Sequence, residues 1–347
     1  MKRIPAPRLA LLPVLAALTA FTAACSKRRE PPLVAILMVA DFRQPTVDGL
    51  IEGLAGFGYL SGERERTGNI LYRIVNAKGD RAALRRLAKE LVAQRPAVLC
   101  AVGGIEADAC IAAARATGVP VIFAGLDNPV ERGLAKSLLE PLPDTTGVRS
   151  GSTELIAKRM ELAKLFFPAI KSVSVLYEPG YVTGEESLRL ARRAGEILGL
   201  AVKPVPLKSD QDVRQFMESV DPEEHEMLLG TPSFLVFSNR KDVIAQGAIR
   251  AKVPFFGFDR QACREGAVLA YGSDFVTFGR QAAHLVRSVL EGAKADSLPI
   301  ELASDIDLCV NLITAEKMDL TLPPLVVDLA DFIMQAGVPS EEAEPHH

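Results

Sequence analysis

The sequence lacks tryptophan altogether and has only four histidines, and both shortages restrict what the protein can do. Aromatic residues make up 6% of the 347 residues, so any aromatic contact with a ligand must come from phenylalanine or tyrosine. An excess of basic residues is also missing, because 40 Lys and Arg stand against 43 Asp and Glu. Proteins that bind nucleic acids usually carry a basic surface, so the composition argues against that class of partner.

Sequence motifs of the common enzyme classes are missing as well. There is no serine nucleophile elbow, no phosphate-binding loop and no spacing of metal ligands. The histidines are poorly placed for catalysis: two lie in the tail, one beside the apolar face of a predicted helix and one in a polar segment, namely His346, His347, His284 and His225. We therefore expect a protein that is not an enzyme and needs neither a metal nor another cofactor.

The first 24 residues have the pattern of a bacterial signal peptide. A positively charged start precedes an apolar run over residues 9–21, which is too short to span a membrane as a mature helix. Small residues then precede Cys25, which resembles the lipid-modified cysteine of bacterial lipoproteins. We expect a signal peptide over 1–24, lipid attachment at Cys25, a polar tether over 25–32 and an exported protein anchored to a bacterial membrane. Ordinary cleavage that leaves Cys25 unmodified is the alternative.

Four further cysteines follow, and their spacing matches no zinc motif: Cys100, Cys110, Cys263 and Cys309. Export makes disulfides possible. Cysteine is nevertheless among the residue types most often buried, so free buried thiols are the expectation for most of them.

Apolar runs alternate with helical patterns along most of the chain. In the first half, strands are predicted over 33–39, 70–75, 97–102 and 119–123, separated by helices over 47–57, 80–94 and up to 117. The pattern then starts again. Helices are predicted over 153–167, 183–198 (from a capping box), 314–318 and 329–336, and strands over 172–177, 200–207, 226–229, 253–258, 267–270 and 305–310. This alternation predicts βαβ units and parallel sheets.

The two similar halves have no long linker between them, so we predict two lobes with chain crossings near 145–149, 270–273 and 301–305. The predicted first lobe comprises 33–146 plus 272–300, and the second comprises 147–271 plus 301–335, before a disordered tail over 336–347. Ligands of open α/β sheets bind at the carboxyl ends of the strands. In a two-lobe protein these ends face the cleft, and hinge closure traps the ligand.

Several segments in a fixed order resemble one family. They read AVGGIEADACIAAA, GVPVIFAGLDNPVERGL, TTGV, VSVLYEPG, YGSDFVTFGRQAA and SLPIEL followed by VNLITAEKMDLTLP. Together they are similar to ABC-transporter substrate-binding proteins of the tryptophan/tyrosine type, over most of residues 33–333. The resemblance implies a type I periplasmic-binding-protein fold, with two Rossmann-like α/β lobes joined by a multi-strand hinge. At Gly104, Asn128 and residues 230–233 the sequence departs from the family pattern, so the ligand stays open.

Candidate ligand-binding residues follow the predicted strands. Phe42 would stack on a ligand or pack between the lobes. The glycines at 103 and 104 open a helix whose free N–H groups would hold a carboxylate, unless they only make a tight turn. Asp127 would contact the ligand or satisfy its own turn. The full set is Phe42, Gly103, Gly104, Ile105, Asp127, Asn128, Tyr177, Glu178, Thr231, Tyr271 and Asp274.

The stretch from Tyr271 to Val286 is central to this prediction. A strand that ends in an aromatic residue, followed by an acid at a helix N-terminus, is a common design for a small polar ligand. Asp274 would cap the helix or pair with a ligand ammonium. Gly279 would let this helix lie close to a sheet. For Glu178, at the end of a second-lobe strand, a solvated loop acid is the alternative to a ligand contact.

These patterns predict a monomeric, lipid-anchored receptor for a small molecule. The resemblance implies that it captures an amino-acid-like solute between its lobes and presents it to an ABC permease with its ATPase. The alternative is a ligand-sensing module that acts on a membrane signalling partner.

Overall fold

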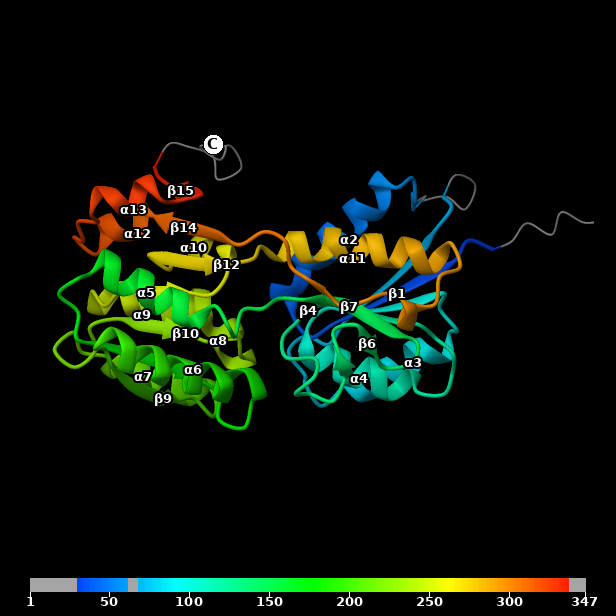
Figure 1. The fold of residues 1–347 in the computed structure, drawn as a ribbon, viewed down its shortest axis with the longest axis horizontal. Coiled ribbons are helices and arrows are strands. Elements are labelled where there is room, and N and C mark those ends of the chain that lie inside the picture. The colour runs from blue at the N-terminus through cyan, green and yellow to red at the C-terminus, as the bar shows by residue number, and fades with distance from the viewer. Residues whose placement is uncertain (1–29, 62–67, 337–347) are drawn as a thin grey trace, which may run out of the picture. The chain divides into compact units, whose positions relative to one another are not determined.

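The computed structural model describes residues 30–61 and 68–336, and two β-sheets organise this part of the chain (Figure 1). Both sheets belong to one compact unit that begins at Pro32. The predicted signal peptide, the lipid attachment at Cys25, most of the tether and nearly all of the tail lie outside the described residues.

The first sheet has six strands in the order β13-β7-β4-β3-β1-β2, all paired in parallel. They are β1 (Leu33–Met38), β2 (Leu71–Asn76), β3 (Val98–Ala101), β4 (Val121–Leu126), β7 (Thr145–Arg149) and β13 (Glu301–Leu302). Helices α2 (Gln44–Gly56) and α11 (Phe275–Leu290) cover one face, and α3 (Leu84–Ala93) and α4 (Gly104–Ala114) cover the other (Figure 1). We call this sheet and its helices the first lobe.

The second sheet has seven strands in the order β15-β14-β12-β11-β10-β8-β9. They are β8 (Ser172–Tyr177), β9 (Ala201–Pro206), β10 (Leu228–Gly230), β11 (Phe255–Gly257), β12 (Leu269–Gly272), β14 (Asp307–Asn311) and β15 (Phe332–Met334). With it lie α5 (Ile156–Phe166), α6 (Val182–Leu198), α7 (Asp210–Ser219), α8 (Phe234–Asn239), α9 (Gln246–Ala251), α10 (Arg260–Arg264), α12 (Leu312–Lys317) and α13 (Pro324–Asp328). This is the second lobe. The β12–β14 pair is antiparallel, an exception to the predicted parallel sheets.

Strand β1 shows why the predicted βα units form. Val34 and Ile36 pack in the same cluster as residues of α2 and α11, whereas Ala35 and Leu37 pack with residues of α3 and α4. All four are fully buried. A parallel strand covered on both faces needs apolar residues at consecutive positions, and this requirement produces the uninterrupted run in the sequence.

Glycines bring α2 and α11 into close contact. A Cβ on Gly49 would lie 2.1 Å from the Val276 carbonyl oxygen, and a Cβ on Gly279 would lie 2.1 Å from the Thr46 carbonyl oxygen. Gly279 therefore serves a helix–helix contact, rather than the predicted approach to a sheet. Because α11 follows β12 of the second lobe, this contact fixes the returning chain on the first lobe.

The predicted lobe boundaries differ from the structure in two places. All of β7 belongs to the first sheet, so the predicted boundary at residue 146 comes too early. Strand β13 pairs with β7, so residues 301–302 also belong to the first lobe rather than the second. A strand at the edge of a lobe and a crossing segment look alike in sequence, because both are short and extended.

Three local predictions are also wrong. The N-cap of α6 is Tyr181, and Thr183 donates its hydroxyl to the Pro232 carbonyl instead of forming a capping box. Asp80 accepts hydrogen bonds from the N–H groups of Ala82 and Ala83 in a turn, so α3 begins only at Leu84. The predicted helix over 329–336 does not form: α13 ends at Asp328, and β15 (Phe332–Met334) within this range pairs with β14.

The cysteines of the lobes are buried and form no disulfide within the described residues, which confirms that expectation. Burial raises the pKa of Cys100 to about 12. Over residues 30–61 and 68–336, no group of His, Cys, Asp or Glu has the arrangement of a metal site. In the same ranges no helix combines the length and apolarity that a membrane span requires.

Candidate functional site

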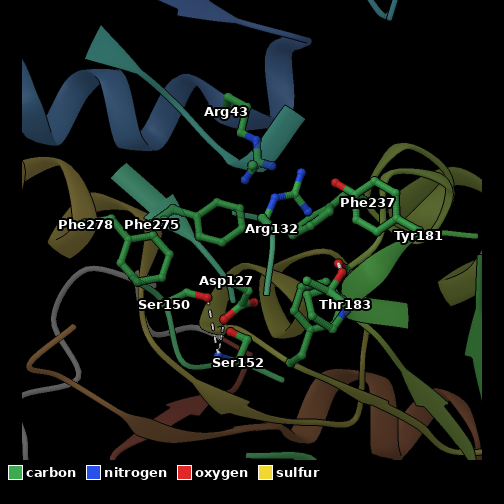
Figure 2. A pocket seen from close by; sticks show the side chains of 14 residues that line it. Arg43, Asp127, Arg132, Ser150, Ser152, Tyr181, Thr183, Phe237, Phe275 and Phe278 are labelled. Carbon is green, nitrogen blue, oxygen red and sulfur yellow. Dashed lines mark hydrogen bonds between the residues drawn. The ribbon is translucent and has the colours of Figure 1, made fainter. Parts of the chain in front are cut away.

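A small cavity lies between the two lobes, at the carboxyl ends of their strands (Figure 2). The first lobe lines it with residues at or after the ends of β1, β3, β4 and β7 and with the start of α11, and the second lobe with residues that follow β8, β10 and β11. The lining consists of Arg43, Gly104, Gly125, Asp127, Arg132, Ser150, Ser152, Tyr181, Thr183, Pro232, Phe237, Phe258, Phe275 and Phe278.

One side of the cavity is cationic. Arg43 ends a short turn after β1, and its Nε lies 3.4 Å from Oε1 of the fully buried Glu106. Arg132 lies in the loop after β4 and forms an ion pair with Asp108 of α4. Figure 2 shows both arginine side chains on the same side of the cavity. The two guanidinium groups make this side attractive to an anionic group.

Glu106 determines how far the charge of Arg43 is compensated. Its Oε1 accepts a hydrogen bond of 3.0 Å from the Val39 N–H, while its Oε2 has no partner among the described residues. Burial raises the pKa of Glu106, and the charge of Arg43 opposes that shift. A buried carboxylate is costly to keep charged, so Glu106 compensates Arg43 only in part.

The opposite side of the cavity carries an acid. Asp127 follows β4, is 6% exposed, and its Oδ1 accepts a hydrogen bond of 3.0 Å from the Ser152 N–H. Figure 2 shows Asp127 with Ser150 and Ser152, away from the two arginines. Burial raises the pKa of Asp127, and a hydrogen bond from Ser150 opposes this shift. A cationic ligand group beside Asp127 would stabilise its charged form.

Aromatic rings form the walls between the two charged sides. Phe237 of α8 meets Phe258 edge to face, with 4.8 Å between ring centroids, and Phe275 at 5.6 Å. Phe278 continues this wall along α11, and Figure 2 shows Tyr181 on the side away from Phe278, where Phe237 also lies. Burial raises the pKa of Tyr181 to about 12, so its hydroxyl stays neutral. These walls suit an apolar or aromatic ligand body.

Two of the predicted ligand-binding residues, Gly104 and Asp127, line this cavity. Gly103 is the N-cap of α4 and lies against the guanidinium of Arg43. Ile105 packs against the core cluster on the α3 and α4 side of the sheet. Asn128 has a left-handed φ of 54° in the turn after Asp127, and its buried Oδ1 has no hydrogen-bond partner among the described residues.

Phe42 and Glu178 hold the lobes together instead of lining the cavity. Phe42 of the first lobe stacks on Phe237 of the second, with 5.1 Å between centroids and an interplanar angle of 3°. Glu178 accepts hydrogen bonds from Arg81 of the first lobe at 2.6 Å and from the Leu235 N–H at 3.2 Å. Glu178 is 8% exposed, so a solvated loop acid is the wrong description.

Asp274 caps α11 as predicted, because its Oδ1 accepts a 2.9 Å hydrogen bond from the Val276 N–H. Its Oδ2 lies 3.0 Å from Nη1 of Arg260, so the carboxylate already has a cationic partner within the protein. Asp274 does not line the cavity. The structure therefore gives Asp274 the capping role and leaves Asp127 as the acid of the cavity.

The other predicted residues of the second lobe also lie outside the lining. Thr231 is fully buried and donates its hydroxyl to the Leu176 carbonyl at 2.8 Å. The carbonyl of Tyr271 accepts a 2.8 Å hydrogen bond from Nε of the buried Arg159. Tyr177 packs partly buried against the core of the second lobe.

Sequence reasoning missed both arginines and every ring of the aromatic walls. Arg43 directly follows Phe42 in a loop that was expected to face the cleft, and Arg132 lies in the loop after Asp127. The signal that identifies them is their position after the carboxyl end of a parallel strand. The sequence alone does not show which of several consecutive loop side chains points inwards, because the turn conformation decides it.

Comparisons with known proteins agree with this architecture. The family model described as "ABC transporter substrate binding protein" matches residues 33–333. A curated "Tyrosine-binding protein" from Clostridioides difficile (strain R20291) is 24% identical over 274 residues, covering 78% of this chain and 76% of the relative.

Two solved structures share the type I periplasmic-binding-protein fold. A conserved domain protein from Vibrio cholerae matches with a TM-score of 0.79 and 25% identity, over 88% of this chain and 100% of that one. An ABC domain from Streptococcus pneumoniae, solved in complex with L-Trp, matches with a TM-score of 0.75 and 19% identity, over the same shares of the two chains. The family description and the curated relative both name binding proteins rather than enzymes.

Proposed function

Because the chain belongs to the family of ABC-transporter substrate-binding proteins, we propose that it captures a zwitterionic amino acid with an apolar side chain between its two lobes. The observation that supports this most is the distribution of charge in the cavity. Arg43 and Arg132 lie on one side, Asp127 lies on the other, and aromatic rings form the walls between them.

Each part of an amino acid finds a matching group in this arrangement. The ligand carboxylate would lie by the two guanidinium groups and the N-terminus of α4, where backbone N–H groups and the helix dipole favour an anion. Its ammonium would pair with Asp127, near the hydroxyls of Ser150 and Ser152. Its side chain would fill the space between Phe237 and Phe278. The named ligands of two similar proteins, tyrosine and L-Trp, support the same class.

Closure of the lobes would tell the transporter that a ligand is bound, because only the ligand-bound receptor would adopt the closed shape. Phe42 and Phe237, and Arg81 and Glu178, meet across the cleft in this closed arrangement. A ligand that binds the closed state better than the open one shifts the population towards closure. We propose that an ABC permease with its ATPase recognises the closed shape, and that the receptor acts as a monomer without a cofactor.

Export and lipid anchoring through Cys25 complete the proposal. An anchored receptor stays close to its permease. The support is the N-terminal sequence pattern, with small residues directly before Cys25.

A thermal unfolding screen against the L-amino acids tests the ligand class. A ligand that binds only the folded form adds about 2.7 kcal/mol of stability at a hundredfold excess over its Kd. We expect the largest rise in Tm with aromatic or branched apolar amino acids, and little change with lysine or arginine. A screen in which sugars stabilise the protein and amino acids do not would contradict the proposal.

A further inference from the structure

Arg132 is a cavity cation whose ion pair within the protein is weakened by solvent. Its ion-pair partner, Asp108, has a side chain that is 46% exposed, whereas Arg43 lies against a carboxylate that is fully buried. Solvent screens an exposed pair more strongly than a buried one. The Nε atoms of Arg132 and of Arg43 are both buried and lack a hydrogen-bond partner in the described part of the chain. An anionic ligand group would supply a partner that the protein itself does not.

Two glycines make room for the guanidinium groups. A Cβ on Gly104 would lie 3.3 Å from Cζ of Arg132, and a Cβ on Gly103 would lie 2.4 Å from Nη2 of Arg43. Gly103 also has a φ of 125°, which other residues rarely adopt. Both guanidinium groups therefore lie at the start of α4, beside helix N–H groups that favour an anion.

Arg132 also contacts the second lobe, through Tyr181. The guanidinium carbon lies 5.9 Å from the centroid of the Tyr181 ring. Both residues line the cavity, while their neighbours in the chain line a separate, more open groove: Asn128, Glu131, Gly180 and Val182. The Arg132–Tyr181 contact thus lies in the wall between the cavity and the groove. It joins residues of different lobes, so it depends on lobe closure.

We infer that Arg132 is a closure-coupled carboxylate clamp, which binds the carboxylate of the captured amino acid while its guanidinium packs on Tyr181. This inference rests on the proposed function and adds a specificity-determining residue to it. A guanidinium is planar, so it binds a carboxylate through its edge and an aromatic ring through its face at the same time. A lysine ammonium lacks this geometry, so Arg132→Lys is not a conservative change.

The test compares three free amino acids with their carboxamides: L-tryptophan, L-tyrosine and L-phenylalanine. Affinities are measured by calorimetry on the wild type and on Arg132→Gln, Arg132→Lys, Tyr181→Phe and Tyr181→Leu. In the wild type, the best acid should bind at least about tenfold more tightly than its amide. Arg132→Gln should reduce this ratio to about twofold or less, with amide affinity nearly unchanged.

The remaining variants separate charge from stacking. Arg132→Lys should keep only part of the acid preference. Tyr181→Leu should weaken the acid about threefold or more, and by more than Tyr181→Phe, which keeps an aromatic face for the guanidinium. Arg85→Gln, on the exposed face of α3, is the matched control and should change nothing. Thermal unfolding checks that each variant is folded. If Arg132→Gln does not fold, the acid-to-amide affinity ratios of Arg132→Lys and of the wild type test the inference instead.

An unchanged acid-to-amide ratio in a folded Arg132 variant, which includes an equal fold-loss for acid and amide, overturns the inference while the proposed function stands. A wild type that binds the acid and its amide equally also overturns it. A wild type that binds none of the amino acids would remove the proposed function and this inference together.

Discussion

Asp127 is the residue on which the assignment of the ligand ammonium depends. It is buried, lies across the cavity from Arg43 and Arg132, and accepts a hydrogen bond from the Ser152 N–H. Asn at this position would keep an acceptor for that N–H group but would remove the charge. The substitution therefore separates ligand recognition from the structure of the loop.

Asp127→Asn should bind the preferred amino acid at least about tenfold more weakly, since removing one side of a buried charge pair typically costs about 2–5 kcal/mol. The Tm of the ligand-free protein should not fall, because burial already disfavours the charged carboxylate. Calorimetry and thermal unfolding measure the two effects. Equal affinity in the variant and the wild type would contradict the assignment.

The raised pKa of Asp127 also predicts how ligand affinity depends on pH. Burial raises this pKa, so the carboxylate becomes neutral at a higher pH than an ordinary aspartate as the pH is lowered. Affinity for a ligand ammonium should therefore decrease as the pH is lowered through the range in which Asp127 becomes protonated. It should recover as the pH rises again. Asp127→Asn should lack this part of the pH profile, whereas other titrating groups would affect both proteins equally.

At the scale of single residues, the sequence predicts positions better than contacts. Asp127 and Gly104 were identified because each follows the carboxyl end of a strand. Glu178 and Phe42 meet the same criterion, yet they contact the opposite lobe. Arg81 and Phe237, their partners, lie far away in the sequence. Only the folded arrangement of the two lobes shows which cleft residues meet each other and which remain for a ligand.

Among the elements, α11 shows how a cap differs from a binding group. Asp274→Asn should keep the cap, because Asn and Asp are nearly equal at this position. It should lose the charged contact with Arg260 and roughly 1 kcal/mol of stability, because Arg260 keeps its second carboxylate partner, Asp307. Ligand affinity should change less than about twofold, unlike in Asp127→Asn. A tenfold loss of affinity without loss of stability would instead show that the ligand ammonium pairs with Asp274.

The strands and helices of both lobes were largely predictable, because period and burial determine them. The run from Leu33 to Val39 and the helix after Asp274 follow directly from their patterns. The errors fall where tertiary context decides. Thr183 has the spacing of a capping box, but its hydroxyl bonds to Pro232 of another loop. Strand β15 looks helical in isolation, but it pairs with β14 at the edge of the second sheet.

For the whole molecule, the Arg81–Glu178 ion pair holds the closed arrangement. Glu178→Gln should weaken ligand binding about two- to fivefold, because a half-exposed ion pair contributes roughly 0.5–1 kcal/mol. The difference from the wild type should shrink at high salt, which screens this pair. Calorimetry at two ionic strengths measures both effects. A variant that binds more tightly would show that the ion pair opposes closure.

Anchoring is a second property of the whole molecule. Cells grown with a fatty-acid analogue should label the wild type but not Cys25→Ala, because the thiol of Cys25 is the proposed attachment site. The variant should still be exported, since its signal peptide is unchanged. Equal labelling of both proteins would contradict attachment at Cys25.

The central claim is that the closed cleft selects a zwitterion, with one charge at Asp127 and the other at the two arginines. Calorimetry on the wild-type protein with L-tryptophan, tryptamine and indole-3-propionic acid tests it most directly, because the last two ligands each lack one charged group. We predict that each analogue binds at least about tenfold more weakly than the amino acid, since each leaves a buried charge of the cleft without its partner. Equal binding of either analogue would contradict the account.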